Sequence, residues 1–385
     1  MRLAILGLSL SSSWGNGHAT TYRALLRAFA ARGHEILFLE RDVPWYAGHR
    51  DLADPDFCDL AFYRELADLD RFRPAIAAAD AVIVGSYVPE GVAVGERVCA
   101  WAGGVRAFYD IDTPVTLAKL AAGDHEYVAP ALIRAYDLYL SFTGGPTLAL
   151  LEARYGAPAA RALYCSVDPH AYPPLDREKR FDLSYLGTYS PDRQPPLERL
   201  LIEPARRAPH LRFAVAGPQY PAGIDWPANV LRIEHLPPAE HPGFYAGSRY
   251  TLNVTRADMI RAGYSPSVRL FEAAACGTPI LTDRWEGLDT VLSPGTEILP
   301  ADTADDVLAV LEGRPEADRL RVAEAARARV MAAHTAAHRA AELEAHLAAA
   351  GDRRRNNDAG RWLGDTGGLG DSGEETVFDL SETRR

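Results

Sequence analysis

Two successive sets of short apolar segments, each alternating with helical stretches, constrain the fold of this chain most. The segments are continuous apolar runs, which is the pattern of parallel strands buried on both faces. Helices between parallel strands cross over in the right-handed sense, so each set predicts a doubly wound α/β sheet. The first set predicts strands at 3–8, 35–40, 81–84, 106–109 and 138–142 and helices at 20–32, 57–69, 92–102 and 146–155. The second set predicts strands at 183–187, 212–216, 230–234, 250–254, 279–282 and 297–299 and helices at 196–207, 241–246, 268–276 and 304–312.

A proline-rich segment, DPHAYPPLD at 168–176, separates the two sets. Closely spaced prolines stiffen the chain and exclude regular structure, so this segment is the expected linker. We predict an N-terminal Rossmann-like domain over 1–170 and a C-terminal one over 171–315. Ligands of open parallel sheets bind at the carboxyl ends of the strands, which places the expected site in a cleft between the domains.

The remaining sequence predicts a helix followed by a tail. Residues 316–350 are alanine-rich and helical in pattern, and 351–385 are rich in Gly, Asp, Arg and Asn, which predicts disorder. His334 and His338 have a spacing that suits a metal on one helix face, but no third ligand accompanies them. We therefore predict no metal site.

Charge and cysteine usage exclude several classes of function. The chain has 385 residues and a net charge of −11, without a long basic run, which argues against nucleic acid as the main partner. No segment approaches the roughly 20 apolar residues of a membrane span, and the opening MRLAILGLSL is interpreted as a buried strand rather than a signal peptide. The cysteines form no CxxC pair, so neither a zinc site nor a dithiol redox motif is indicated. Their wide spacing and apolar neighbours favour reduced thiols and predict a cytoplasmic protein. The cysteines are Cys58, Cys99, Cys165 and Cys276.

No cofactor is expected. Lys119 and Lys179 are the chain's two lysines, and neither stands in a setting that suggests the Schiff base of pyridoxal phosphate. The loop after the first strand lacks the G-x-G-x-x-G fingerprint, which disfavours a nicotinamide dehydrogenase.

The stretch YSPSVRLFEAAACGTPILTD, at 264–283, predicts a short helix with both ends marked. Ser265 is a favourable N-cap and Pro266 suits the first helical position. Bare N–H groups at a helix start attract an anion, and Glu272 lies roughly 9 Å further along the axis. That spacing suits a nucleotide with its phosphates at the helix start and its ribose hydroxyls at the carboxylate. The alternative is a surface helix on which Glu272 pairs with Arg269.

These residues resemble the nucleotide-sugar site of GT-B glycosyltransferases, above all the spore-maturation (CgeB-type) enzymes and, more distantly, retaining family-four enzymes. The distant relatives carry a Glu-x7-Glu pair before a similar A-C-G-T-P run. Glu272 matches the second acid, whereas Tyr264 stands at the position of the first. The resemblance implies two Rossmann-like domains facing across a cleft. It also implies a hexosyltransferase-like (EC 2.4), metal-independent and retaining transfer from a nucleotide-diphosphate sugar, in spore or cell-surface glycosylation.

The second set of strands supplies the expected donor site. The resemblance implies a phosphate-binding arginine after the first strand of this set, which makes Arg193 the candidate for the diphosphate, and a guanidinium can bind phosphate oxygens in pairs. The alternative is a surface pair with Asp192 or Glu198. Gly187 and Gly217 form turns after strands, and Asn253 and Arg256 are expected to face the nucleotide. The donor helix adds Tyr264, Ser265, Pro266, Ser267, Arg269 and Glu272.

The first set supplies the expected catalytic residues. Gly15 and Gly17 allow a tight loop that resembles the flexible loop beneath the donor in GT-B enzymes, and His18 stands at the entrance of the next helix. His18 is a candidate for binding a sugar or acceptor hydroxyl, with a structural role as the alternative. Asp110 and Asp112 either orient hydroxyls or cap the helix that follows them.

Two other functions remain open. A catalytically silent nucleotide-sugar-binding or assembly protein is consistent with Tyr264 in place of the first acid. A sugar-nucleotide epimerase of GT-B fold would need no acceptor. The nucleobase, the sugar, the acceptor (a glycan, a protein or a small molecule), the general base and the oligomeric state are left undetermined by the sequence.

Overall fold

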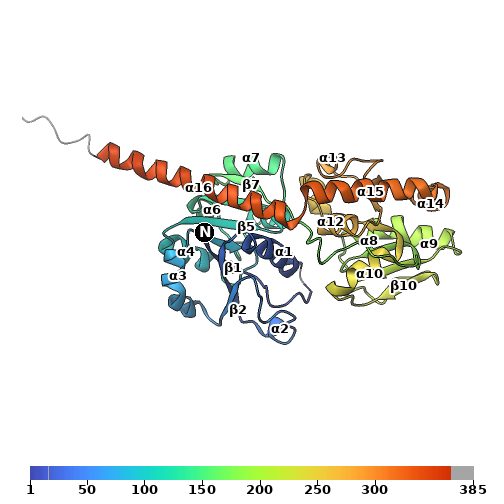
Figure 1. Cartoon of the computed structure of the whole chain (residues 1–385), viewed down its shortest axis with the longest axis horizontal. Coiled ribbons are helices and arrows are strands. Elements are labelled where there is room, and N and C mark those ends of the chain that lie inside the picture. The colour runs from blue at the N-terminus through green and yellow to red at the C-terminus, as the bar shows by residue number, and fades with distance from the viewer. Residues whose placement is uncertain (16, 366–385) are drawn as a thin grey trace, which may run out of the picture.

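The computed structural model describes residues 1–15 and 17–365, which form two α/β domains side by side (Figure 1). The first contains a seven-stranded, all-parallel sheet in the order β3-β2-β1-β4-β5-β6-β7, and the second a six-stranded parallel sheet in the order β10-β9-β8-β11-β12-β13. Helices cover both faces of each sheet, so the predicted pair of doubly wound Rossmann-like domains is confirmed.

The strands of the first sheet are β1 Arg2–Gly7, β2 Glu35–Arg41, β3 Asp59–Tyr63, β4 Ala81–Gly85, β5 Val105–Asp110, β6 Leu138–Ser141 and β7 Ala160–Ala162. Its helices are α1 His18–Ala30, α2 Pro44–Ala47, η1 Leu66–Phe72, α3 Arg73–Ala78, α4 Gly91–Trp101, α5 Thr113–Ala121, α6 Pro130–Ala135 and α7 Pro146–Ala153. The helix predicted over 57–69 is wrong. Its first half is the edge strand β3, paired with β2 from Leu37 to Arg41, and only its end enters η1.

The strands of the second sheet are β8 Phe181–Leu186, β9 Phe213–Ala216, β10 Val230–Ile233, β11 Ser248–Asn253, β12 Ile280–Thr282 and β13 Leu299–Pro300. Its helices are α8 Gln194–Leu197, η2 Glu198–Ile202, α9 Glu203–Arg207, η3 Pro238–Glu240, α10 His241–Ala246, α11 Ala257–Ala262, α12 Val268–Ala275, α13 Leu288–Val291 and α14 Ala304–Gly313. Every strand predicted for this half is present, within a few residues at each end.

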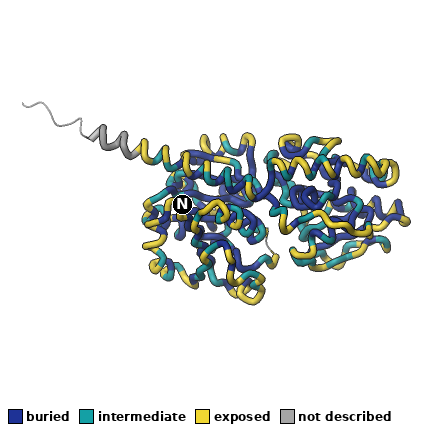
Figure 2. Tube along the Cα trace, viewed as in Figure 1, coloured by how far each residue is buried: buried dark blue, intermediate teal, exposed yellow. Residues whose placement is uncertain are grey.

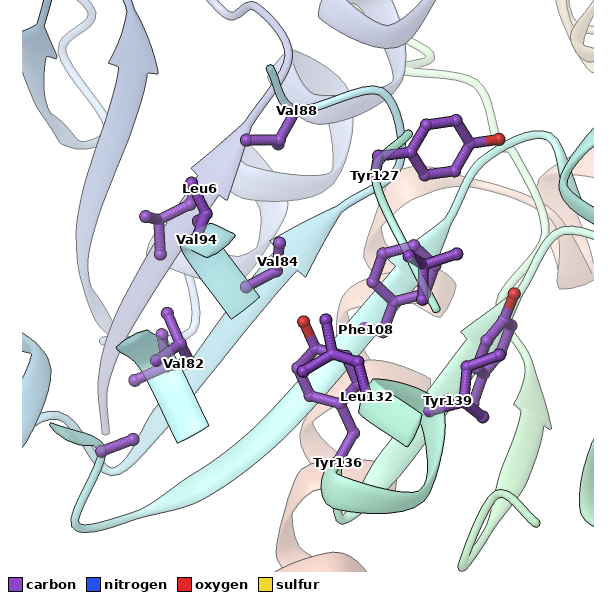
Figure 3. Close-up of a cluster of buried hydrophobic side chains, with 14 of the residues drawn as sticks. Leu6, Val82, Val84, Val88, Val94, Phe108, Tyr127, Leu132, Tyr136 and Tyr139 are labelled. Carbon is purple, nitrogen blue, oxygen red and sulfur yellow. The ribbon is translucent and has the colours of Figure 1, made fainter. Parts of the chain in front are cut away.

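Buried apolar side chains fill both faces of the first sheet (Figure 2). On one face, Leu6, Val84 and Phe108 from the strands pack against Val94 of α4 and Leu132 of α6 (Figure 3). Burying such side chains stabilises the domain by about 1.5–3 kcal/mol each, which fixes the strand register and the positions of the loops at the sheet edge.

The chain returns to the first domain at its C-terminal end. Helix α15, Glu316–Ala333, packs on α12, and the chain then bends at His334 and Thr335. Helix α16, Ala336–Asp365, crosses to α1 and to β5 and β6 (Figure 1). Val167, directly before the linker, forms a β-bridge with Thr335, where the chain crosses back to the first domain. Two segments of the chain therefore run between the domains.

The disordered tail predicted over 351–385 does not begin at Gly351. Residues 351–365 continue α16, because Arg354 forms an ion pair with Asp137 of the first domain at 3.0 Å and Arg355 pairs with Asp352 one turn away. The rest of that prediction, 366–385, lies outside the described residues. Within the described part of the chain, no helix has the length and apolarity to cross a membrane.

Candidate functional site

Of the cavities between the domains in the described part of the chain, two adjoining ones gather most of the predicted site residues. The first cavity has a volume of about 220 Å³ and lies between the loop after β1 and the ends of β8, β9 and β10, with α12 as its floor. It brings together many of the predicted donor residues, namely Gly15, Gly17, Gly187, Gly217, Arg269 and Glu272. These residues come from both domains, so closure of the domains controls the shape of the cavity.

Gly187 and Gly217 follow β8 and β9 and lie against each other. A Cβ on Gly217, where φ is +144°, would overlap the carbonyl group of Gly187. A Cβ on Gly187 would lie only 2.8 Å from Nη2 of Arg269 and 2.6 Å from the hydroxyl of Tyr185. Both positions therefore require glycine, and this wall of the cavity is formed by backbone and by the Arg269 guanidinium.

Arg269, in the first turn of α12, is 7% exposed and held from two sides. Its Nε donates to the carbonyl oxygen of Leu186 at 2.6 Å, and its Nη1 donates to Oδ1 of Asn253 at 2.8 Å. Asn253 is fully buried and donates to the hydroxyls of Thr255 and Thr282. Arg269 thus presents a fixed positive charge at the cavity. Asn253, which was expected to face the nucleotide, lines neither cavity and instead positions the Arg269 guanidinium.

Glu272 lines the same cavity one turn further along α12. It is 5% exposed, and its Oε2 accepts a hydrogen bond from the Tyr245 hydroxyl at 3.2 Å. The alternative of a surface ion pair between Arg269 and Glu272 is wrong, because both side chains are buried and Arg269 turns toward β8 and β11. The Tyr172 hydroxyl also hydrogen-bonds this carboxylate, so a bound hydroxyl would share Glu272 with two tyrosines.

The helix begins at Val268, as the helix predicted over 268–276 does, but its N-cap is Ser267 rather than Ser265. Ser265 is not its N-cap, since its hydroxyl bonds to that of Thr143 in the first domain at 3.0 Å. The carbonyl oxygen of Pro266 accepts a hydrogen bond from Sγ of Cys165 at 3.3 Å. The residues expected to open the helix instead join the two domains.

Tyr264 lies at the centre of this contact between the domains. It has a φ of +46°, and the backbone N–H of Gly144 donates to its carbonyl oxygen at 2.9 Å. Its ring is held between Gly145 of the first domain and Gly287 of the second, and a Cβ on either glycine would overlap it. Tyr264 lines neither cavity, so a donor-binding role for its side chain is not supported by its position.

The second cavity, of about 260 Å³, adjoins the first, with Gly17 and Val268 lining both. It is bounded by the start of α1, the end of β5, α11 and the segment before α12. The predicted residues that line it are His18, Asp112, Arg193, Arg256, Pro266 and Ser267. A group bound here would lie next to the one in the first cavity, which is the arrangement that a transfer between two substrates requires.

His18 and Asp112 face this second cavity from the first domain. Burial lowers the pKa of His18 to about 4, so its ring is neutral at neutral pH. Among the described residues its Nδ1 has no hydrogen-bond partner, and its ring meets that of Tyr87 edge-on, with 5.4 Å between centroids. A buried, unsatisfied ring nitrogen is suited to bind a substrate hydroxyl, because leaving it unpaired is unfavourable.

Asp112 accepts a hydrogen bond from the Tyr87 hydroxyl at 3.2 Å and forms an ion pair with Arg256 of the second domain at 3.4 Å. Burial raises the pKa of Asp112, and the nearby Arg256 guanidinium opposes this shift. The ion pair joins the domains across the second cavity, so a ligand there must compete with it or bind beside it.

Asp110 does not face a substrate. It is fully buried, and its carboxylate accepts from the Tyr139 hydroxyl at 2.5 Å and the Thr116 hydroxyl at 2.7 Å. Burial raises its pKa to about 6. Asp110 lines neither cavity, so its position does not support orienting a substrate hydroxyl. Its carboxylate instead holds the start of α5, through the backbone N–H of Asp112 and the Thr116 hydroxyl, which agrees with the alternative of a role at that helix end.

Arg193 lines the second cavity rather than the first. Its Nη2 donates to the carbonyl oxygen of Thr188 at 2.7 Å and its Nε to the Ser190 hydroxyl at 3.1 Å. The surface pairs considered for it do not form in the described structure, where Glu198 pairs with Arg206. Arg193 and Arg256 thus bring two positive charges to one side of the second cavity.

Sequence reasoning missed Glu40, which shapes the glycine loop. Glu40 is fully buried at the end of β2 and accepts hydrogen bonds from the backbone N–H groups of Leu10 and Ser11 and from the hydroxyls of Ser9 and Ser11. A carboxylate that binds four donors of one loop fixes its course. The sequence does contain a signal for Glu40: an acid at the end of an apolar strand, in a chain with a serine-rich loop after its first strand.

The architecture and the site define a GT-B protein with a cleft between two Rossmann-like domains. Residues 193–345, less than half of the chain, match the family model described as glycosyl transferase-like, and this segment holds most of the second domain. No curated protein matches the chain.

Solved structures share the fold over nearly the whole chain. Sucrose-phosphate synthase from Thermosynechococcus elongatus is similar with a TM-score of 0.62 and 15% identity, over 93% of this chain and 99% of that one. HepE from Anabaena, in complex with UDP and glucose, has a TM-score of 0.67 and 12% identity, over 91% and 100%. An alpha-glucosyltransferase in complex with UDP-glucose and DNA containing an abasic site has a TM-score of 0.65 and 13% identity, over 90% and 99%. These similarities show the GT-B fold.

Proposed function

We propose that the protein is a glycosyltransferase that moves a sugar from a UDP-sugar to an acceptor hydroxyl. The observation that carries the proposal is the first cavity, where a glycine loop of one domain faces Arg269 and Glu272 on the donor helix of the other. The glycosyl transferase-like match over 193–345 and the UDP complexes of HepE and the alpha-glucosyltransferase support this reading.

The chemistry follows from the charges at the cleft. Transfer breaks the bond between the sugar and the diphosphate, so negative charge grows on the leaving group. We propose that Arg269, Arg193, Arg256 and the start of α12, which line the two cavities, stabilise that charge in a site that excludes water when the domains close. These positive groups would let the transfer proceed without a metal ion.

The finer features of the proposal rest on the resemblance to known enzymes. We propose transfer of a hexose with retention of the anomeric configuration, as in the family-four enzymes, and a role in spore or cell-surface glycosylation, as in the CgeB-type enzymes. We also propose that the protein acts in the cytoplasm, which agrees with four unpaired cysteine thiols. Proton NMR of the product tests retention, since an inverted anomeric signal would contradict it.

A thermal-shift panel with UDP, GDP, dTDP, ADP and CMP, each with Mg²⁺ or with EDTA, tests the donor site. A ligand at 100 times its Kd stabilises the folded state by about 2.7 kcal/mol, so UDP should raise Tm selectively and equally in both conditions. No shift with any nucleotide would contradict the donor site. A shift only with Mg²⁺ would contradict metal independence.

Turnover separates the proposal from the two alternatives. A silent binding protein would bind UDP-glucose without consuming it, and an epimerase would change the donor with no acceptor present. The silent protein was considered because Tyr264 replaces the first acid of the Glu-x7-Glu pair. In the structure Tyr264 contacts both domains and lines neither cavity. The proposed enzyme should release UDP, slowly with water and faster with an acceptor.

A further inference from the structure

Two exposed tryptophans lie on the first domain, and one of them, Trp14, belongs to the loop that lines the first cavity. Of the tryptophans whose side chains the structure describes, only Trp14 and Trp45 are exposed, at 48% and 55%. Trp14 follows β1 in the glycine loop, and Trp45 lies in α2 after β2. Both therefore stand at the carboxyl edge of the sheet, where ligands of this fold bind.

His49 joins the two tryptophans into one surface. Its ring stacks on that of Trp14 with centroids 4.4 Å apart and planes within 16°, and its Nδ1 bonds to the carbonyl oxygen of Trp45 at 3.1 Å. We call Trp14, Trp45 and His49 the aromatic rim. Trp14 and His49 thus form an exposed stacked pair, and Trp45 adjoins this pair through its backbone carbonyl.

The aromatic rim is held in place before any ligand arrives. The Ser12 hydroxyl donates to the carbonyl oxygen of His49 at 2.8 Å, and the backbone N–H and hydroxyl of Ser13 donate to Asp51 at 3.0 and 2.6 Å. Arg23 also forms an ion pair with Asp51. A rigid aromatic surface binds with little loss of conformational entropy.

Trp14 of the rim belongs to the loop that lines the first cavity, where the proposed donor would bind. Ser13, Gly15 and Gly17 line the first cavity, and Trp14 stands between Ser13 and Gly15 on the outer side of the same loop. A molecule stacked on Trp14 would therefore be separated from the proposed donor only by this loop. The part of an acceptor that does not react would lie at such a position.

The chemistry and size of the rim favour sugar rings. Two half-exposed indoles offer roughly 250 Å², far below the roughly 800 Å² that a stable protein partner covers on each side. The nearby charges are mixed, with Asp51 half-exposed and Asp42 paired to Arg50, whereas an anionic membrane selects a basic surface. A pyranose has a flat C–H face for an indole and a ring of hydroxyls for carboxylates and guanidinium groups.

We infer that the acceptor is a carbohydrate chain whose sugar rings stack on the aromatic rim while its reacting hydroxyl enters the second cavity beside His18 and Asp112. This inference rests on the proposed function and names the acceptor class for the same cleft.

The test uses the full chain with UDP bound and a panel of probes: cellopentaose, maltopentaose, chitopentaose, xylopentaose and mannopentaose. Indole N–H signals in NMR report binding at the tryptophans. At least one pentasaccharide should shift the signals of Trp14 and Trp45. Trp14→Ala and Trp45→Ala should each weaken its binding about tenfold, and Trp14→Phe should restore most of it.

Leu320→Ala is the matched control, because Leu320 is an equally exposed apolar residue on α15 of the other domain, and it should change nothing. Binding of UDP without any pentasaccharide would overturn the inference and leave the proposed function standing, whereas failure to bind UDP would contradict the proposed function itself. Saccharide binding that both tryptophan variants leave unchanged would also overturn the inference. The inference would also be overturned if phosphatidylglycerol vesicles shifted the indole signals and no saccharide did.

Discussion

Glu272 is the residue whose role can be isolated most cleanly. Glu272→Gln keeps an oxygen for the Tyr245 hydroxyl but removes the charge that strengthens a hydrogen bond to ribose. Hydrogen bonds to charged groups contribute about 1.5–3 kcal/mol, so UDP affinity should fall roughly tenfold to a hundredfold. Isothermal titration calorimetry measures the change.

Two comparisons make this result specific. UDP lacking both ribose hydroxyls should bind the wild type and Glu272→Gln equally. Glu312→Gln, a change of an exposed carboxylate that pairs with His210, should have no effect on UDP binding. If the variant loses affinity for both nucleotides alike, the ribose role is wrong.

Arg193 tests where the diphosphate lies. Arg193→Ala removes a positive charge from the second cavity and two bonds to the loop at 188–190. We expect it to weaken UDP binding about tenfold and uridine binding little, because only UDP carries the charge that the guanidinium contacts. Arg199→Ala, a surface arginine on η2, is the control. Equal losses for UDP and uridine would remove Arg193 from the phosphate site.

At the residue scale, the sequence predicted the cavity better than the catalytic residues. Gly187, Gly217 and Glu272 were found because turn glycines and helix spacing are local features that a linear sequence records. Asp110 and Tyr264 were misplaced, since their environments are built by Tyr139 and by Gly145, which lie far away in sequence. Short motifs cannot indicate which of two nearby acids the sheet buries.

At the scale of elements, α16 belongs to the first domain although it follows the second in sequence. Leu343 of α16 is fully buried in one core with Leu3, Ile5 and Phe29. Leu343→Ala should therefore lower the free energy of unfolding of the first domain by about 2–5 kcal/mol through the lost burial and the cavity left behind. Urea unfolding, followed by hydrogen exchange to assign each domain, measures it.

The exposed Leu320 of α15 provides the comparison, and Leu320→Ala should change the free energy of unfolding by less than about 0.5 kcal/mol. A destabilised second domain in Leu343→Ala, with the first unaffected, would contradict the assignment of α16.

Element boundaries show where sequence patterns stop being informative. Continuous apolar runs located the central strands, because burial on both faces dictates their composition. The edge strand β3 was taken for a helix, since its pairing with β2 depends on a neighbour rather than on its own pattern. The break between α15 and α16 was also missed. It is fixed by tertiary contacts, including Arg339 bonded to His334 and Val167 paired with Thr335.

At the scale of the whole molecule, the two domains are joined by a few well-defined contacts, one of which lies at the second cavity. The Tyr264 ring between Gly145 and Gly287 is one, and the ion pair between Asp112 and Arg256 is another. The first is a close apolar contact that resists sliding, whereas the second is partly exposed and weak. Tyr264 therefore serves as the fixed point about which the domains are oriented.

Gly145→Ala tests this arrangement. The new methyl group would overlap the Tyr264 ring and push the domains apart, so the first cavity would lose its glycine-loop wall. We expect UDP affinity to fall about tenfold and the radius of gyration from small-angle X-ray scattering to rise. Gly123→Ala is the matched control, because Gly123 also has a positive φ, at +76°, but has open space around it. Gly123→Ala controls for a positive φ, whereas Gly145 also has a ψ of −140°, which adds a backbone cost of its own to Gly145→Ala. Equal UDP affinities and equal radii in the two variants would show that Tyr264 does not set the distance between the domains.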